Sequence, residues 1–527
     1  IIYNQQHMKK SFTIYHLIFP VLLAMSFTTK LFSAQIHIPE DFPSIQQGID
    51  ASAEGDSVIV APGSWYEHLS LDGKNITLGS WFLTTGDTAY IRQTILDGSN
   101  TGRLISVSDI YGLARISGFT IINGYSGEGS AIRITNSHLQ ADHLNILNCT
   151  AECGNNQFVY GGGIFCWAST LIISDFIFDN NRVLCSTSGV NPEGGALFAG
   201  NSELHLIRGK FINNCAYLGG GICFSNNCTA FIEQVDFIAN EAPWPGGGIC
   251  AFGGELNISE CTFRGNTGDG IYSMFEGSLD IQNCLFAYNE RSAISVFDQE
   301  LTIINSTFAS NGSYHNLYIS APEASIYNSI IWGQGENEII FSGPENNLYL
   351  IHSLIRNGVS GISGNVTKQI IGSLLSEDPQ FTDTVAFRLS DSSPGIGAGI
   401  DTITSYPYLA APWFDLDLNP RPVPSGSAPD LGAREHELGS PVTGFINKDA
   451  QNEAIVVFQP ERGIIRISGE EIKSVSVFNA GGKLVSFSDK LTRGQALVDL
   501  RDNPAGIYLL SMLMKSDRSV VRKVIIW

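Results

Sequence analysis

The chain has 527 residues, 43% of them hydrophobic, and a formal net charge of −21 at pH 7. This apolar content excludes a disordered tail protein, and the length allows two or three domains. This excess of acidic over basic residues argues against nucleic acid as a partner, because phosphate binding requires a basic surface. It also disfavours acidic polysaccharides unless cations bridge the two, although salt screens such repulsion beyond roughly 8 Å.

The N-terminal residues have the pattern of a secretory signal peptide. A methionine and two lysines at 8–10 precede an apolar run over 14–25 and a small residue, Ala34. We therefore predict a signal peptide over 1–34, with residues 1–7 upstream of the true start. The apolar run is too short to span a bilayer, so we expect no transmembrane segment in the mature chain. Its expected location is secreted or at the outer cell surface.

Residues 35–80 predict a capping helix followed by short strands. Ser44 can cap a helix in which Ile45 and Ile49 share one face. The open end of a solenoid exposes its apolar core, so a cap of this kind is required there. The segments VIVAPGSWYE and LSLDGKNITLGS are predicted as strands interrupted by Pro-Gly and Asp-Gly turns.

A short repeat occupies residues 130–360. Each unit opens with a Gly-Gly-aliphatic segment, such as GGGIF at 161–165, and closes with an aromatic-x-x-Asn segment, such as FINN at 211–214. The units recur every 22 to 33 residues and contain no helical segment. A unit this short cannot bury its own apolar face and must stack on its neighbours. The sequence therefore predicts an all-β fold, a right-handed parallel β-helix (solenoid).

Side-chain alternation sorts the repeat into three columns that should face inward. The opening segments contribute an aliphatic column: Ile132, Ile164, Leu197, Ile222, Ile249, Ile271, Ile294, Leu317 and Ile339. The closing segments contribute an aromatic column: Phe178, Phe211, Phe237, Phe263, Phe286 and Phe308. Three residues later an asparagine column follows: Asn181, Asn214, Asn240, Asn266, Asn289 and Asn311. Asparagine tolerates the left-handed backbone of a sharp corner, and stacked amides can hydrogen-bond between coils. We interpret all three columns as structural.

A fourth column should face outward beside the opening strand of each coil. It consists of Phe165, Phe198, Cys223, Cys250, Tyr272, Ser295 and Tyr318. Aromatic rings in line on a solenoid wall offer flat apolar faces on which sugars can stack. The predicted substrate-binding residues are Phe165, Phe198, Tyr272, Tyr318, Trp167 and Trp244. The alternative is that the loops 150–160 and 183–193 fold over this face and bury the rings.

The ten cysteines all lie in the central repeats. Export permits disulfides, but a sequence alone cannot give their connectivity. Cys261 and Cys284 share an inward position, so we expect buried thiols there. Cys223 and Cys250 share an outward position and could equally pair or stay free.

No cofactor is predicted, although calcium is a possible one. The sequence has no CxxC pair and no histidine cluster at metal-ligand spacing. Cys149 and Cys153 are four residues apart and could bridge or ligate a metal. Residues 415–419 have the Asp-x-Asp-x-Asn spacing of a calcium loop, but Pro420 stands where an EF-hand requires glycine. We interpret that segment as a turn that closes the last coil.

Two segments resemble pectin-lyase-like β-helix proteins. Residues 45–67, with IQ, GID, GD, PG and YE, are similar to the start of the solenoid in that family. Residues 377–437, with DPQF, RL, SP and D-x-GA-x-E, resemble the closing segment of many exported bacterial β-helix proteins, although Gly397 stands where the family has aspartate. The resemblance implies a β-helix over 35–437. It implies no particular activity, because one fold hosts many functions.

Residues 451–527 differ in character, because the glycine-rich openings stop and short alternating strands appear. The segments VSVFNAGGKLVSF, ALVDLRDNPAGIYLLSMLM and RSVVRKVIIW resemble the C-terminal sorting domain of type IX secretion substrates. This resemblance implies a small β-sandwich, joined through a linker over 438–450 and recognised by the type IX machinery. It further implies passage across the outer membrane, usually with removal of the domain.

Catalytic motifs are weak, and no catalytic residue is predicted. DFIF at 175–178 matches a pectin methylesterase motif with Asp175 as nucleophile, but other coils have Arg208, Gln234 and Glu260 at the equivalent position. A polysaccharide lyase needs a base close to clustered carboxylates. The nearest approach to such a cluster combines two basic residues with three carboxylates: Arg208, Lys210, Glu233, Asp236 and Glu260. Solvated surface charge explains that group equally well.

Three functional hypotheses follow. The leading one is an exported solenoid that binds a polysaccharide, a cell-surface glycan or another surface partner through its wall. The second is a polysaccharide lyase or glycoside hydrolase of pectin-lyase-like fold, which rests on analogy of fold. The third is a structural surface-layer protein or adhesin. A groove with convergent carboxylates and a base would favour the second, and a smooth wall would favour the third.

Overall fold

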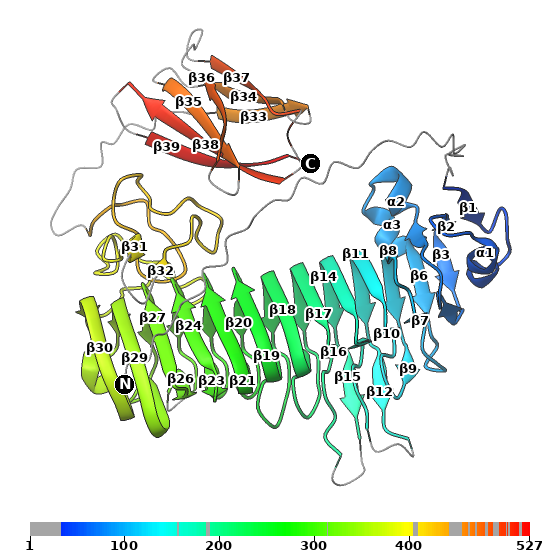
Figure 1. Ribbon diagram of the computed structural model, residues 1–527, viewed down its shortest axis with the longest axis horizontal. Coiled ribbons are helices and arrows are strands. Elements are labelled where there is room, and N and C mark those ends of the chain that lie inside the picture. The colour runs from blue at the N-terminus through cyan, green and yellow to red at the C-terminus, as the bar shows by residue number, and fades with distance from the viewer. Residues whose placement is uncertain are drawn as a thin grey trace, which may run out of the picture.

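The computed structural model describes residues 33–441, except for four short gaps at 155–157, 186–189, 313–314 and 404–408, and most of residues 456–526. The predicted signal peptide therefore lies outside the described residues except for its last two positions. One sheet of 27 strands pairs almost wholly in parallel, from coil to coil along the chain. This confirms the right-handed parallel β-helix (Figure 1).

Each central coil contributes one strand segment to each of three walls. The first wall contains β7 (Ile105–Ser108), β10 (Ile132–Thr135), β13 (Ile164–Trp167), β16 (Leu197–Gly200), β23 (Ile294–Phe297), β26 (Leu317–Ser320) and the beginnings of β18 (Ile222–Ile238), β19 (Ile249–Ser259), β21 (Ile271–Gln282) and β29 (Ile339–Ile355). The second wall contains β24 (Glu300–Ile304), β27 (Glu323–Tyr327), later parts of β18, β19, β21 and β29, and the first halves of β8 (Leu113–Ile122), β11 (His138–Leu147), β14 (Thr170–Asp179) and β17 (Glu203–Ile212). The third wall contains the second halves of those four strands, the end of β18, and β20 (Thr262–Arg264), β22 (Leu285–Ala287), β25 (Thr307–Ala309) and β28 (Ile330–Trp332).

The N-terminal coils contain β1 (Gln35–Ile38), α1 (Ile45–Ala51), β2 (Ser57–Val60), β3 (Gly63–Trp65), β4 (Leu69–Ser70), β5 (Thr77–Ser80), α2 (Phe82–Thr85), α3 (Ala89–Gln93) and β6 (Thr94–Asp97). Helix α1 is the predicted capping helix. The Ser44 side chain accepts a hydrogen bond from the backbone N–H of Gln47 at 3.3 Å, and Ile45 and Ile49 are buried. Local capping and one apolar face were enough to specify this helix.

Short additions decorate the solenoid. Strands β9 (Tyr125–Ser126), β12 (Thr150–Glu152) and β15 (Arg182–Leu184) pair in a small parallel sheet formed by the long connections between coils. The last coil contains η1 (Gly358–Gly361) and β30 (Ile362–Leu375), and β31 (Thr402–Ile403) pairs with β32 (Leu409–Ala410).

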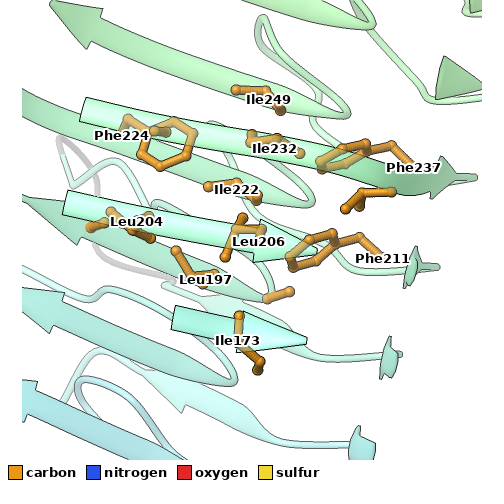
Figure 2. Close-up of a cluster of buried hydrophobic side chains, with 14 of the residues drawn as sticks. Ile173, Leu197, Leu204, Leu206, Phe211, Ile222, Phe224, Ile232, Phe237 and Ile249 are labelled. Carbon is orange, nitrogen blue, oxygen red and sulfur yellow. The ribbon is translucent and has the colours of Figure 1, made fainter. Parts of the chain in front are cut away.

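The core consists of side-chain columns in register. The predicted aliphatic and phenylalanine columns are fully buried, and Figure 2 shows Phe211 and Phe237 one above the other beside isoleucines and leucines of the same coils. Ring centroids along the column lie 5.0 Å apart for Phe211 and Phe237 and 4.5 Å apart for Phe237 and Phe263. These spacings follow the strand separation of about 4.8 Å, so each ring packs on its equivalents above and below.

The asparagine column forms a continuous hydrogen-bonded ladder at the corner after the third wall. The Asn240 side-chain amide donates to the Phe211 carbonyl at 2.9 Å and to Asn266 Oδ1 at 3.0 Å. Asn266 Oδ1 also accepts the backbone N–H of Asn240 at 3.0 Å. The ladder continues to Asn316, whose amide donates to the buried Glu338 carboxylate. Every rung therefore satisfies polar groups that would otherwise be buried without partners.

Residues 377–437 pack against the third wall over the later coils. The Ala433 backbone N–H donates to Thr307 Oγ1 at 2.9 Å, and Phe387 packs beside Leu285 and Ala309. Within this closing segment, Asp415 Oδ1 accepts the backbone N–H groups of residues 417 and 419, which confirms a turn at the calcium-like spacing.

A buried ionic cluster holds the closing segment together. The Arg421 guanidinium lies 2.6 Å from Glu435 Oε1, and neither side chain is exposed by more than 1%. Asp430 accepts the backbone N–H groups of Gly397 and His436. Burial raises the pKa of Asp430 to about 8, and the nearby Glu435 charge adds to the effect. A single guanidinium among several buried carboxyl groups therefore favours a protonated Asp430 at neutral pH.

The C-terminal residues form antiparallel sheets of three and four strands. The strands are β33 (Val456–Glu461), β34 (Ile464–Ser468), β35 (Ile472–Asn479), β36 (Leu484–Ser488), β37 (Gln495–Asp499), β38 (Gly506–Met514) and β39 (Ser519–Ile526). Their apolar residues form a core of their own, which includes Ile465, Val475 and Leu510. A separate core is consistent with a separate folding unit.

The cysteines give one disulfide among the described residues. Cys153 bonds to Cys185, so the possible Cys149–Cys153 bridge is not formed. Cys261 and Cys284 are buried free thiols, as predicted, and Cys223 and Cys250 are free as well. Parallel side chains in register point the same way, which disfavours the disulfide dihedral.

We expect Phe237→Ala to lower the free energy of unfolding by about 3–5 kcal/mol, because it removes one ring from a closed stack and leaves a cavity. Urea unfolding of the purified chain measures the loss. Phe231→Ala is the matched control, since Phe231 lies on the solenoid surface with 41% exposure. Equal losses in the two variants would contradict the column arrangement.

The closing segment should loosen as the pH rises. Folding raises the pKa of Asp430, so the folded chain keeps a proton that the unfolded chain has released, and stability falls from about pH 4 towards about pH 8. Hydrogen exchange across residues 395–436 at pH 6 and pH 9 should show faster opening at the higher pH. The Asp430→Asn variant should lose most of this difference, and an unchanged difference in that variant would refute the assignment.

Candidate functional site

The first wall presents two outward rows of side chains. The row predicted from the sequence is in register across the coils: Phe165, Phe198, Cys223, Cys250, Tyr272, Ser295 and Tyr318, and the structure extends it by Arg133. Two residues further along each strand lies a second row: Thr135, Trp167, Gly200, Ser225, Phe252, Met274, Phe297 and Ser320. Both rows face outward because strand side chains alternate between the two faces.

The prediction of exposed rings is wrong for Phe165 and Phe198, which are only 6% and 2% exposed. The Tyr160 ring lies 4.3 Å from that of Phe198, centroid to centroid, and the two phenylalanine rings stack at 5.5 Å. The connections that carry β12 and β15 are the longest between coils and are tied by the Cys153–Cys185 disulfide. At Phe165 and Phe198 the structure therefore agrees with the alternative prediction, in which the outward rings are buried beneath the connections between coils.

Further along the solenoid the coils are shorter and the rings are half-exposed. The Tyr272 and Phe297 centroids are 5.3 Å apart, and those of Phe297 and Tyr318 are 5.5 Å apart. Phe275 is 54% exposed and lies 6.2 Å from Phe252. We call these five residues the aromatic stripe. Tyr272 and Tyr318 belong to the first outward row and Phe252 and Phe297 to the second, whereas Phe275 lies at the corner just after the second row.

Sequence reasoning missed Phe252 and Phe297 because it followed only the first outward row. Each lies two residues after a position that was identified, so the same alternation, carried one step further, would have found them.

Besides Phe165 and Phe198, two further predicted binding residues lie outside the aromatic stripe. The half-exposed Trp167 stacks against Phe165, and its ring covers Gly200, where an added Cβ would come within 2.4 Å of it. Trp244 is exposed but lies on the turn before β19, where it contacts Tyr217. Trp167 is therefore part of the first wall, whereas Trp244 is not.

Two carboxyl groups hydrogen-bond to side chains of the first outward row. Cys223 Sγ lies 3.5 Å from Glu193 Oε2, and burial raises the pKa of both groups. Asp269 accepts hydrogen bonds from the Ser292 backbone N–H and from Ser295 Oγ, each at 3.1 Å, and burial raises its pKa too. Both carboxyl groups are engaged within the protein, so we assign them a structural role.

The weak catalytic candidates are engaged in ion pairs. Both carboxylate oxygens of Asp175 accept hydrogen bonds from Arg208 at 2.8 Å, and Lys210 lies 3.2 Å from Asp236. Burial raises the pKa of Asp175, but the hydrogen bonds and charge of Arg208 outweigh it and leave the pKa below its ordinary value. Asp175 is therefore a paired turn residue with a left-handed φ of 55°. In the part of the chain that the structure describes, no group of three or more His, Cys, Asp or Glu residues could hold a metal ion.

Comparisons with protein families agree with this architecture in two parts of the chain. Residues 247–405 match the family described as right handed beta helix region, and residues 459–527 match the secretion system C-terminal sorting domain. No helix among the described residues is long and apolar enough to cross a membrane.

Individual similar proteins are distant. Metabotropic glutamate receptor-like protein R of Dictyostelium discoideum is 26% identical over 305 residues, which cover 50% of this chain and 17% of that protein. A mutant of the PL6-family alginate lyase AlyGC is 14% identical over 80% of this chain and 60% of that chain, with a TM-score of 0.40. The ORF18 protein of Geobacillus virus E2 is 11% identical over 93% of this chain and 76% of that chain, with a TM-score of 0.35.

This chain thus spans a small part of the receptor-like protein and less than two thirds of the lyase. Similarity at these TM-scores carries no information about activity. The family matches, the parallel three-walled sheet and the separate antiparallel domain agree with one another. The chain is a right-handed parallel β-helix protein with a C-terminal sorting domain, which marks it as a secreted or cell-surface substrate of type IX secretion.

Proposed function

We propose that the chain binds glycans outside the cell through the aromatic stripe on the first wall. The observation that carries this proposal is the line of half-exposed rings of Tyr272, Phe297 and Tyr318, with centroid spacings of 5.3 and 5.5 Å. Each ring offers a flat apolar face, and several rings in line fit a linear polymer better than a single small sugar.

The wall holds these rings in place before any ligand arrives. Their strands are paired in register on both sides, and the side chains pack against one another. A site built on rigid strands loses little conformational entropy on binding, which favours affinity.

The formal charge of −21 favours neutral glycans, or acidic ones only where cations such as calcium bridge the two. The lyase alternative would need a base free to remove a proton from the sugar. Its candidates Arg208 and Lys210 are both paired with carboxylates, so binding without catalysis is the better-supported function. A purely structural surface role would show as absence of glycan binding.

Tyr318→Ala and Tyr272→Ala should each weaken binding to a neutral polysaccharide about tenfold, which corresponds to about 1.4 kcal/mol. Isothermal titration calorimetry against soluble glucan, mannan and xylan measures the effect. Tyr111→Ala is the matched control, because Tyr111 is 84% exposed and outside the aromatic stripe. Equal binding by all three variants would refute the proposed surface.

Processing provides a separate test of the secretion signals. Mass spectrometry of the secreted protein should find a start near Gln35 and loss of the region after about residue 440, because both flanking segments are expected to be removed. Deletion of 451–527 should also block export. Normal export of the deleted chain, together with intact 451–527 on released protein, would contradict the sorting role.

A further inference from the structure

A polar cleft lies at the corner between the first and second walls, outside the aromatic stripe. Its volume is about 350 Å³, and its lining includes His138, Thr170, Asn201, Glu203, Asn227 and Thr229. Two of the other lining residues, Ala168 and Ser202, follow closely after Trp167 and Gly200 in the chain. The cleft therefore adjoins the first wall where the Trp167 ring lies over Gly200.

The cleft arises from an uneven corner. In two successive coils a single residue with left-handed backbone turns the chain: Ala168 with φ of 50° and Asn201 with φ of 49°. In the next coil both Asn226 and Asn227 are left-handed, and the strand register shifts between Ser225 and Cys228. The extra residue makes this turn project beyond its neighbours and form one side of the cleft.

The outward row of the second wall forms the floor. His138, Thr170, Glu203 and Thr229 lie in register on four successive coils. The Glu203 carboxylate lies 3.0 Å from His205 Nε2, and the His205 ring stacks on Phe231 with centroids 4.9 Å apart. The position of the Glu203 carboxylate is thus set by an imidazole that is itself held by an aromatic ring.

The chemistry of the lining matches sugar hydroxyl groups. Asn201 and Asn227 are exposed to solvent and line the cleft, so the side-chain amides of both can face a ligand. An amide donates and accepts, and a carboxylate can accept from two neighbouring hydroxyls at once. Trp167 on one side and Phe231 on the other add apolar surface near these polar groups.

The negative charge of the cleft disfavours the binding of acidic sugars. No lysine or arginine lines the cleft. Glu203 belongs to an outward row of the second wall. The row continues with Glu255 two coils later, Glu300 two coils after that, and Glu323 in the following coil. The carboxylate of a uronic acid would meet Glu203 directly and would be repelled by it.

We propose that this cleft is a second glycan subsite, that it takes a neutral sugar through its hydroxyl groups, and that Glu203 determines the preference for neutral over acidic glycans. The inference deepens the proposed function, because one polymer could contact both the first wall near Trp167 and the cleft. It depends on different residues from the aromatic stripe, so the two can fail separately.

The test measures binding of the full chain to neutral glucan, mannan and xylan and to acidic alginate and polygalacturonate, in chelator. Glu203→Gln should weaken binding to the neutral polymers about tenfold, because it replaces one of the two acceptor oxygens of the carboxylate with an NH2 donor and removes the negative charge. Glu203→Lys should bind the acidic polymers more tightly than the wild type does. Glu323→Gln is the matched control, since it changes the same charge in the same row outside the cleft, and it should bind as the wild type does. Thermal unfolding confirms that each variant is folded.

Wild-type binding by Glu203→Gln, with weakened binding by Tyr318→Ala, would overturn the cleft and leave the aromatic stripe. The reverse pattern would support the cleft and overturn the stripe. An equal loss in Glu323→Gln would overturn the assignment to Glu203, because the effect would then come from general charge. Absence of binding to every neutral polymer by the wild type would overturn both proposals.

Discussion

The hydrogen bonds of the asparagine ladder fix the register on which the rest of the solenoid depends. Asn240 shows the pattern of the ladder: its side-chain oxygen accepts two N–H groups of Asn214, and its amide donates to the Phe211 carbonyl of the preceding coil and to Asn266 of the next coil. All the amides of the ladder point the same way, so their dipoles reinforce one another. The last acceptor is the buried Glu338 carboxylate, which also accepts the Gly333 backbone N–H at 3.0 Å. An anionic terminus suits a row of donors that all point towards it.

Fixed register at one corner lets the coils differ in length elsewhere. The closing phenylalanines recur after 22 to 33 residues, yet the outward rows of the first wall remain aligned. The additional residues are placed in the connections before the first wall and in the corner turns after it. The long connections bury Phe165 and Phe198, the short ones leave Tyr272 and Tyr318 half-exposed, and one extra turn residue at Asn226–Asn227 produces the cleft. Surface variety is thus obtained without disturbing the core.

The closing segment shows a different way of satisfying buried groups. The main solenoid has mostly amides, hydroxyls and thiols at its buried polar positions, with single carboxyl groups such as Glu338 and Asp269, whereas the closing segment buries Arg421 together with Glu435 and Asp430. A buried ion pair is a costly contact, but each of its oxygen atoms finds an N–H donor here. Its geometry fixes how residues 395–436 lie on the third wall, which ties the end of the β-helix to coils more than one hundred residues earlier.

The sequence by itself determined the parallel β-helix, its capping helix, its inward columns and the sorting domain. The first three follow from short-range physics: strand alternation, the left-handed preference of asparagine, and the capping ability of Ser44. The sorting domain was identified from its resemblance to type IX secretion substrates. Only the tertiary structure decided which outward rings are accessible, that Cys153 pairs with Cys185, and where a cleft opens. Those outcomes depend on where connections of unequal length fold over a neighbouring coil. Alternation gives the face on which Phe165 and Tyr318 lie, but whether a ring such as Tyr160 covers that face is a long-range packing event with no local signature.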